Sequence, residues 1–327
     1  MDSTVRLLAT GSCVPEKVLS NEDLLKMVDT SDEWIVSRTG IRERRIVSEG
    51  EENSDLATEA ARRALDAAGM DPLDVDHIIV CTFTADMPLP TSACAVQDKL
   101  GASHASAVDL AAACTGFIYG LSHGAAMVRA GHAERVLVIA CETLSKVTDY
   151  QDRGTCVLFG DGAGAAILDA GEGGHRVGSF FLAADGAGRH ILNIPDGGSS
   201  RPPTADTLAR RGHCIKMKGQ EVFKFAVTKI MQLIKNAAAR EGIKPGDFDL
   251  VVPHQVNRRI IKAAVDRLNM REDDFFMNVE KYGNTSGASV AIALDEAVHT
   301  GAIKEKDKVL MMAFGGGFTW GSAVIHW

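Results

Sequence analysis

Cys114, His254 and Asn284 are the residues of this sequence whose types and settings could carry out covalent chemistry. Each lies where a strand should end and a loop or helix begin, in the segments LAAACTGF, VVPHQVNRR and KYGNTSGAS. A thiol nucleophile with histidine and asparagine partners is a known kind of catalytic set, whose members meet in space and not in sequence. Taken singly, each has a simpler interpretation: a buried small apolar cysteine, a hydrogen-bonded structural histidine and a turn asparagine. Together they predict a thiol-dependent site with Cys114 as the nucleophile.

The setting of Cys114 predicts an activated thiol. The small-residue run after it has the character of a helix that reaches Met127, which puts Cys114 at the N-terminus of that helix. Unpaired backbone N–H groups and the positive end of the helix dipole at this position favour the thiolate. We therefore expect the pKa of Cys114 to lie below that of an ordinary cysteine.

Two glycine-rich segments differ in what they predict. In AFGGGFTWGS, Gly315, Gly316 and Gly317 follow a strand, and three glycines let the backbone approach a ligand with its N–H groups pointing inward. One such N–H, together with that of Cys114, could form an oxyanion hole, and a flexible turn is the alternative. The segment FGDGAGA (159–165) loosely resembles a nucleotide-binding loop. It lacks the acidic residue and the βαβ spacing that such a site needs, so we interpret it as close backbone packing.

A repeated pattern indicates the elements that position these residues. GMDPLDVDHIIV (69–80) and GIKPGDFDLVVP (242–253) share a glycine, a proline and two aspartates at an offset of 173 residues. RVLVIAC (135–141) matches KVLMMAF (308–314) at the same offset. In the first pair of segments, each copy follows an alanine-rich helical run and ends in a short apolar run, which is typical of a strand covered on both faces. The sequence therefore predicts two copies of one α/β unit.

The repeat predicts an α/β protein of two similar halves, which we place at residues 1–172 and 173–327. The nucleophile belongs to the first half, and His254 and Asn284 belong to the second. Residues 185–212 are rich in glycine, proline and serine. This composition is typical of a long surface loop, which could cover a site.

Composition and charge narrow the class of protein. The chain has 327 residues, of which 46% are hydrophobic, and a formal charge of −8, which argues against a nucleic-acid partner. The sequence begins without a signal-peptide pattern, and no apolar run reaches the ~20 residues that span a bilayer. We therefore expect a cytoplasmic protein with no membrane association. The seven cysteines are scattered without a CxxC pair, which argues against a disulfide framework and a thiolate metal site.

At this point the motifs resemble a known family. ACTGF, HQVN, GNTSGAS and AFGGGFTWGS are similar to motifs of β-ketoacyl-acyl-carrier-protein synthase III, a condensing enzyme of the thiolase superfamily. DTSDEWIVSRTGIRERR (29–45) and DRGTCVLFGDGAGAAIL (152–168) resemble further motifs of that family. The resemblance covers nearly the whole chain. It implies a thiolase-like α/β fold, with two duplicated βα halves in a five-layer αβαβα arrangement, and a homodimer.

The resemblance also implies a two-step reaction that starts fatty-acid synthesis. Cys114 would take an acyl group from acyl-coenzyme A (acyl-CoA), with the oxyanion on the backbone N–H groups of Cys114 and Gly316. Malonyl-acyl carrier protein would then lose CO₂ while His254 and Asn284 hydrogen-bond the developing enolate. The resulting carbanion would attack the acyl-enzyme. Acyl-CoA is a substrate here, so neither a cofactor nor a metal is expected.

Further residues carry roles that the family implies. Trp34 and Arg153 would enclose the adenine of coenzyme A (CoA), with Arg38 near its phosphates. The walls of the pantetheine tunnel would be Met217, Gly219, Phe223 and Asn257. The acyl pocket would include Leu89 and Phe159, and the basic residues that dock an acidic carrier protein would be Arg259, Lys262 and Lys224.

The sequence departs from the family pattern at two positions. The familiar HQAN is HQVN here, so Val256 adds bulk beside the tunnel. Leu89 stands where well-known acetyl-specific members have phenylalanine, which would leave room for a longer or branched primer.

Two alternatives stay open at this point. A related enzyme could use the same three residues to acylate another nucleophile or to build a secondary metabolite. A non-catalytic thiolase-like scaffold is the alternative of another class, although it would gain nothing from keeping Cys114, His254, Asn284 and the glycine triple.

Overall fold

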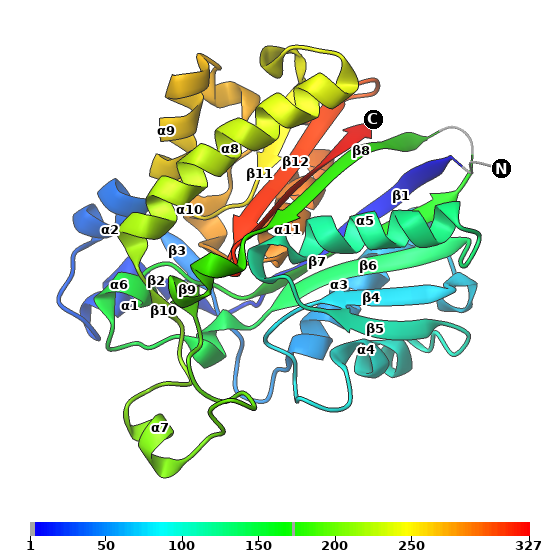
Figure 1. Cartoon of the computed structure of the whole chain (residues 1–327). Coiled ribbons are helices and arrows are strands. Elements are labelled where there is room, and N and C mark those ends of the chain that lie inside the picture. The colour runs from blue at the N-terminus through cyan, green and yellow to red at the C-terminus, as the bar shows by residue number, and fades with distance from the viewer. Residues whose placement is uncertain (1–3, 172–173) are drawn as a thin grey trace.

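Within residues 4–171 and 174–327, which this computed structural model describes, nine strands form one mixed sheet (Figure 1). The N-terminal strands follow the order β5 (Ser106–Leu110), β4 (His77–Cys81), β6 (Arg135–Glu142), β7 (Gly162–Ala170) and β1 (Val5–Cys13). The C-terminal strands continue as β8 (His175–Ala184), β13 (Thr319–His326), β12 (Lys308–Gly315) and β11 (Leu250–Pro253). β1 joins β8 through two described residue pairs, Arg6 with Arg176 and Leu7 with His175. The sheet therefore consists of two groups of strands in contact at one point.

Helices cover and separate the two groups of strands. The outer layers are α3 (Asn53–Ala68) with α4 (Ser92–Leu100) on the N-terminal strands, and α8 (Gly219–Glu241) with α9 (Arg258–Leu268) on the C-terminal strands. The middle layer is α5 (Gly116–Arg129) and α11 (Ala288–His299), which contact strands of both groups. These two helices are rich in buried residues, as expected for helices packed between sheets. The expected five-layer α/β arrangement is confirmed.

The repeat is visible in the hydrogen-bond register of the sheet. β4 pairs in parallel with β6 so that His77 lies opposite Val136, and β11 pairs in parallel with β12 so that Leu250 lies opposite Val309. The two pairs are 173 residues apart, which is the offset seen in the sequence. The expected boundary between residues 172 and 173 lies outside the described residues, and the division into two domains stays a prediction.

The turns that precede the repeated strands also match. Gly69 ends α3 with φ 62° and Gly242 ends α8 with φ 67°, a left-handed conformation that glycine adopts without a Cβ clash. Short 3-10 turns follow at Pro72–Asp74 and Pro245–Asp247. The glycine and proline of each copy therefore end a helix and lead into a strand, as predicted.

Short elements connect the layers. They are β2 (Val18–Ser20), β3 (Glu43–Arg45), α1 (Asn21–Leu25), α2 (Asp32–Thr39), α6 (Arg153–Cys156) and α10 (Val279–Tyr282). Among the helices of residues 4–171 and 174–327, none combines the length and apolar character needed to cross a membrane.

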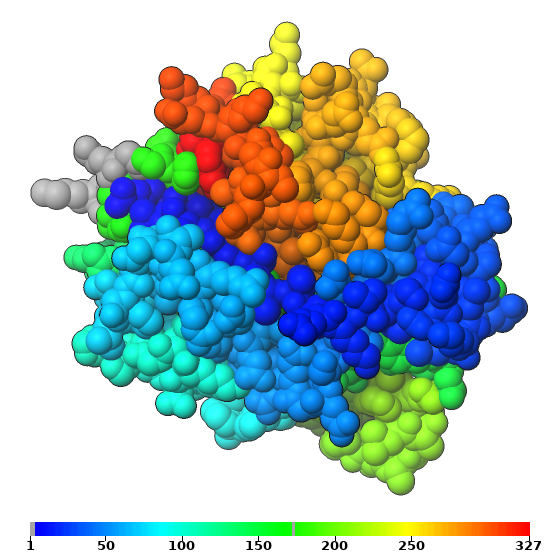
Figure 2. Space-filling model, turned by 180° about the vertical axis from the view of Figure 1, so that it is seen from behind, coloured from blue at the N-terminus to red at the C-terminus, as the bar shows by residue number. Residues whose placement is uncertain are grey.

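Residues 185–217, called the strap below, include the predicted surface loop. Its elements are a 3-10 turn (Gly186–His190), β9 (Leu192–Asn193), α7 (Ala205–Ala209) and β10 (Lys216–Met217), with β9 paired to β10. α7 projects from the body of the molecule, and from behind the same region forms a lobe at its edge (Figures 1 and 2). The buried carboxylate of Asp149 accepts hydrogen bonds from Arg211 (3.1 Å) and Lys216 (3.2 Å). These ion pairs attach the returning part of the strap to the N-terminal half.

Candidate active site

Cys114 lies at the strand-to-helix junction that the sequence predicts. It belongs to the 3-10 turn Ala113–Thr115, between the end of β5 and the start of α5. Ala113 has φ 47°, a left-handed conformation in which the chain turns sharply before the thiol. From the other side, Gly315 at the end of β12 packs so closely that a Cβ there would lie 2.8 Å from Cys114 Cβ. β12 can therefore reach this turn because position 315 has no side chain.

The thiol of Cys114 is buried but surrounded by hydrogen-bond donors. Ser286 Oγ lies 3.4 Å from its Sγ, and this hydroxyl and the backbone N–H groups of Cys114 and Gly316 act to lower the pKa of the thiol. Burial nevertheless raises the pKa of Cys114 to about 11, against the lowering effect of these donors. The predicted lowering of this pKa is therefore wrong, because the loss of water raises the pKa by more than the favourable hydrogen bonds lower it.

His254 follows β11 directly and is 1% exposed. Its backbone N–H donates to the Met312 carbonyl on β12 (2.8 Å), and its ring meets the Phe314 ring edge-on at 5.5 Å between centroids. Ser289 Oγ lies 2.6 Å from its Nδ1. Burial lowers the pKa of His254 to about 3, so the ring is neutral near pH 7. A neutral imidazole has one N–H, which suits it to donate a hydrogen bond to a ligand oxygen.

Asn284 is held by both its backbone and its side chain. Its N–H donates to the Leu158 carbonyl (2.8 Å), and its carbonyl accepts from Gly160 N (3.0 Å), on either side of Phe159. Its Oδ1 accepts a hydrogen bond from the backbone N–H of Ser286 (2.8 Å). Because Oδ1 is engaged in this way, the Nδ2 amide is the end that can donate to a ligand.

The turn from Asn284 to Ser289 connects the three predicted catalytic residues. Ser286 contacts the sulfur of Cys114, and Ser289 contacts the ring of His254. Sequence reasoning selected Asn284 in GNTSGAS and missed both serines. The only sign of the two serines in the sequence was a hydroxyl two and five residues after Asn284. Their directions depend on a left-handed Ser286 (φ 50°) and on the start of α11 at Ala288, which local sequence does not display.

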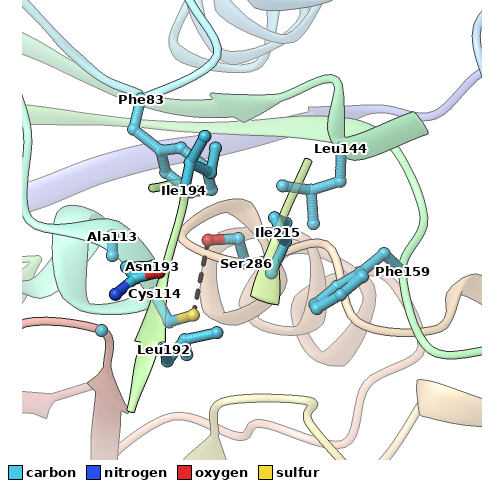
Figure 3. A pocket seen from close by; sticks show the side chains of 11 residues that line it. Phe83, Ala113, Cys114, Leu144, Phe159, Leu192, Asn193, Ile194, Ile215 and Ser286 are labelled. Carbon is cyan, nitrogen blue, oxygen red and sulfur yellow. Dashed lines mark hydrogen bonds between the residues drawn. The ribbon is translucent and has the colours of Figure 1, made fainter. Parts of the chain in front are cut away.

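A cavity of about 210 Å³ opens beside the thiol (Figure 3). Its lining residues are Phe83, Ala113, Cys114, Leu144, Phe159, Leu192, Asn193, Ile194, Ile215, Ser286 and Gly316. Four of them, Leu192 to Ile194 and Ile215, come from the strap, so the expected surface loop does cover the site. The cavity is lined mostly by apolar side chains. It therefore has the size and the apolar walls that suit a short acyl chain attached to Cys114.

Phe159 lies in this cavity as predicted, but Leu89 does not. Leu89 is 83% exposed in the segment between β4 and α4. The single chain therefore does not place Leu89 in its own cavity, because this side chain is turned toward solvent, and its expected place in the acyl pocket stays a prediction. The apolar walls come instead from Phe83, Leu144 and the strap.

Comparison with known proteins agrees with this geometry. Residues 108–186 match the family model of 3-Oxoacyl-[acyl-carrier-protein (ACP)] synthase III, and residues 238–327 match the model of its C-terminal part. The β-ketoacyl-[acyl-carrier-protein] synthase III of Caldanaerobacter subterraneus subsp. tengcongensis is 52% identical over 321 residues, which cover 98% of this chain and 97% of that protein. The chain belongs to the 3-oxoacyl-[acyl-carrier-protein] synthase III family.

Two further relatives match this synthase over nearly its full length. The β-ketoacyl-[acyl-carrier-protein] synthase III of Natranaerobius thermophilus is 50% identical, over 99% of this chain and 100% of that protein. The crystal structure of the 3-oxoacyl-[acyl-carrier-protein] synthase III from Aquifex aeolicus VF5 superposes with a TM-score of 0.91 at 42% identity, over 99% and 100% of the two chains. The chain is therefore a condensing enzyme, an acyltransferase with a thiolase-like fold.

The synthase residues expected at the adenine of CoA lie together. The guanidinium carbon of Arg153 is 4.9 Å from the centroid of the Trp34 ring, and Arg153 also donates to the Asp29 carbonyl (2.8 Å). The Arg153 guanidinium thus lies over the Trp34 ring. An adenine could enter between them after Arg153 moves aside, so their sandwiching role stays a prediction.

The other expected ligand-binding residues surround the junction of α2, α8 and α9. Asn257 Nδ2 donates to the Arg38 carbonyl (3.0 Å), which joins α2 to the start of α9. Figure 2 shows the blue N-terminal segment against the gold segment that follows β11. Met217, Gly219 and Phe223 lie at the end of the strap and in the first turns of α8, and the exposed basic residues are Lys224 on α8 and Arg259 and Lys262 on α9. Their binding roles stay predictions.

Proposed function

We propose that this synthase starts fatty-acid synthesis by joining an acyl primer from acyl-CoA to the malonyl group of malonyl-acyl carrier protein. The observation that carries the proposal is the buried Cys114 thiol at the wall of an apolar cavity, with Gly316 in the same wall and the turn from Asn284 to Ser289 beside it. The products are β-ketoacyl-acyl carrier protein, CO₂ and free CoA.

In the first step, the sulfur of Cys114 attacks the carbonyl carbon of acyl-CoA. The negative charge on the carbonyl oxygen is stabilised by the backbone N–H groups of Cys114 and Gly316, and a single donor of this kind is typically worth about 2.7–4 kcal/mol. The bond to the CoA sulfur then breaks, and the proton from the Cys114 thiol ends on that sulfur. Because burial raises the pKa of Cys114, the proton must leave as the new bond forms.

In the second step, the malonyl thioester loses CO₂ and its electrons move onto the thioester oxygen. We assign the stabilisation of this enolate to the N–H donors of His254 and Asn284. Neutral donors suit this task, because the charge that they stabilise develops only on the way to the transition state. The enolate carbon then attacks the acyl-enzyme, the new carbon–carbon bond forms, and Cys114 is released as a thiolate that regains a proton. The chain's own residues supply each group in these steps, so the proposal includes no cofactor and no metal.

The exposed Arg259, Lys262 and Lys224 are proposed to dock the acidic carrier protein. They belong to α8 and α9, which pack on each other, in a chain whose overall charge is negative. Such local charge complementarity chiefly speeds association and orients the partner. A cytoplasmic location and the absence of a nucleic-acid or membrane partner stay predictions.

The proposed reaction is tested by supplying acyl-CoA primers with malonyl-acyl carrier protein. We expect CO₂ release in step with β-ketoacyl-acyl carrier protein, detected by mass spectrometry. The apolar cavity of about 210 Å³ predicts that primers longer than acetyl-CoA, straight or branched, are also accepted, and each added methylene should change discrimination by ~1–3 kcal/mol. Acyl transfer without CO₂ release would identify instead the related acyltransferase. An unacylated and inactive chain would identify the scaffold, although the 52% identity to a synthase does not favour either alternative.

We also propose that the enzyme is a homodimer that forms along β5. This strand is the edge of the nine-stranded sheet, and Val108 on it is 42% exposed. Unpaired edge strands with exposed apolar side chains are ready to pair with another chain. Light scattering should give twice the chain mass of 34.8 kDa, and Val108→Lys should shift the particles toward the single-chain mass. A single-chain mass for the unchanged protein would contradict the dimer.

A further inference from the structure

We propose that Ser289 is a positioning residue that keeps the proton of the neutral His254 ring on Nε2, through a hydrogen bond from its hydroxyl to Nδ1. The assignment of the tautomer follows from the hydrogen bonds of the substrate-free protein. Its consequence for catalysis rests on the proposed function, in which His254 donates to the enolate oxygen.

The contact between the two side chains is short and buried. Ser289 Oγ lies 2.6 Å from His254 Nδ1, and each residue is 1% exposed. Ser289 stands in the first turn of α11, where its N–H donates to the Ser286 carbonyl (3.2 Å). A hydroxyl in this setting has no bulk water to satisfy it, so its proton needs an acceptor within the protein.

The second hydrogen bond of Ser289 decides the direction of the first. The backbone N–H of Gln255 donates to Ser289 Oγ (3.3 Å), so this oxygen already acts as an acceptor. If Nδ1 carried a proton, it would donate to the same oxygen, and the hydroxyl proton would be left without an acceptor among the described residues. If Nδ1 is unprotonated, it accepts the hydroxyl proton and every group is paired. The second arrangement leaves the one ring proton on Nε2.

The neutral state of the ring makes this a choice between two tautomers. Burial lowers the pKa of His254 to about 3, so the doubly protonated ring is not populated near pH 7. The ring also has an apolar neighbour in Phe314, whose ring lies edge-on at 5.5 Å between centroids.

The side chain of Gln255 is held by hydrogen bonds of its own, which fix the position of the backbone N–H that donates to Ser289. Its Nε2 donates to the carbonyls of Pro253 (2.8 Å) and Phe276 (3.0 Å), and its Oε1 accepts from Asn278 N (2.9 Å). The glutamine of HQVN therefore holds the backbone beside His254 in one conformation. Its N–H acts on the tautomer through Ser289.

The tautomer matters because only Nε2–H can offer a proton from the side of the ring opposite to Ser289. With the proton on Nδ1, Nε2 would present a lone pair to the developing enolate oxygen, which is repulsive. Removing the serine hydroxyl should therefore slow decarboxylation and leave attack by Cys114 unchanged.

The experiment reads the tautomer directly in the substrate-free enzyme. Histidine is labelled with ¹⁵N, and the His254 ring signals are identified by their loss in His254→Asn. We expect the unchanged protein to show a protonated Nε2 and an unprotonated Nδ1 that accepts a hydrogen bond. A proton on Nδ1 would overturn the proposal.

Variants then separate positioning from a structural role. Ser289→Ala should lose the hydrogen-bond shift at Nδ1 and slow CO₂ release from malonyl-acyl carrier protein by about 10- to 100-fold, by analogy with the loss that follows removal of the partner that orients a metal-bound histidine. Its rate of acylation by acetyl-CoA should stay within about twofold, and Ser289→Thr, which keeps the hydroxyl, should restore the Nδ1 signal and CO₂ release. Ser286→Ala is the matched control for the spectrum, because that serine contacts Cys114 and not His254.

Two outcomes would contradict the role of Ser289. They are an unchanged Nδ1 signal in Ser289→Ala, and an equal loss of acylation and CO₂ release in a folded variant. If the tautomer is as expected but the unchanged enzyme releases no CO₂, the proposed function fails while the tautomer assignment stands.

Discussion

Cys114→Ala is expected to carry no acyl group after incubation with acetyl-CoA, whereas the unchanged enzyme gains one acetyl group on this residue. The physical reason is the geometry of the cavity. Cys114 supplies the sulfur that contacts the Ser286 hydroxyl at the cavity wall, where Gly316 also lies. Alanine keeps the backbone donors but removes the atom that forms the thioester. Mass spectrometry of the intact protein and of its peptides measures the result.

The six other cysteines serve as internal controls for this prediction. Cys81, Cys141 and Cys156 are buried and, unlike Cys114, do not line the cavity, so we expect no acylation there. An acyl group that persists in Cys114→Ala, on any cysteine, would contradict the assignment of the nucleophile. If the unchanged protein is not acylated either, the scaffold alternative is favoured.

The pH dependence of alkylation tests the state of the same thiol. Because burial raises the pKa of Cys114 to about 11, the thiolate fraction is small at pH 7 and grows as pH rises toward that value. The rate of alkylation by iodoacetamide should therefore keep rising above pH 9. Ser286→Ala should move this rise to higher pH, because it removes a donor that lowers the pKa. A plateau of the rate below pH 8 would show that the helix N-terminus lowers the pKa of Cys114 by more than burial raises it.

The repeat and the Cys114 thiol show what local sequence can and cannot predict about the site. The repeat at an offset of 173 residues predicted the paired strands, because it recurs in their hydrogen-bond register. The sign of the Cys114 pKa shift was predicted wrongly, because a helix terminus is visible in sequence whereas burial of the thiol arises from packing by β12 and the strap. Local sequence shows the helix dipole, which lowers the pKa of the thiol. The tertiary structure adds desolvation, which raises that pKa by more.

The positions of Leu89 and of the two serines show a second limit. Leu89 was assigned to the pocket from its place in a motif, but exposure depends on where the segment after β4 turns, and it turns this side chain to solvent. Ser286 and Ser289 looked like ordinary turn residues. Their roles depend on partners that are 172 and 35 residues away in the chain. Motifs thus located the residues that we predict to react, whereas the contacts of the two serines with them required the fold.

Asn284→Ala is expected to spare acylation of Cys114 while slowing CO₂ release about 10²–10³-fold, the typical effect of removing one donor from an oxyanion site. Only the second step places negative charge on the malonyl thioester oxygen, for which Asn284 Nδ2 is the proposed donor. The two rates are measured separately, by acyl-enzyme formation with acetyl-CoA and by CO₂ release from labelled malonyl-acyl carrier protein.

Asn284→Asp is the matched control, because alanine changes more than the donor. Asn284 Oδ1 accepts the Ser286 N–H (2.8 Å), and Ser286 in turn donates to Cys114, so alanine also frees the serine that contacts the nucleophile. Aspartate keeps an oxygen for Ser286 but replaces the Nδ2 donor with a second acceptor. If Asn284 acts only on the enolate, both variants lose CO₂ release and retain acylation. If acylation falls as far as CO₂ release in both, the division of labour between Cys114 and Asn284 is wrong. A fall of acylation in the alanine variant alone would trace that loss to Ser286, since aspartate keeps the oxygen that accepts the Ser286 N–H.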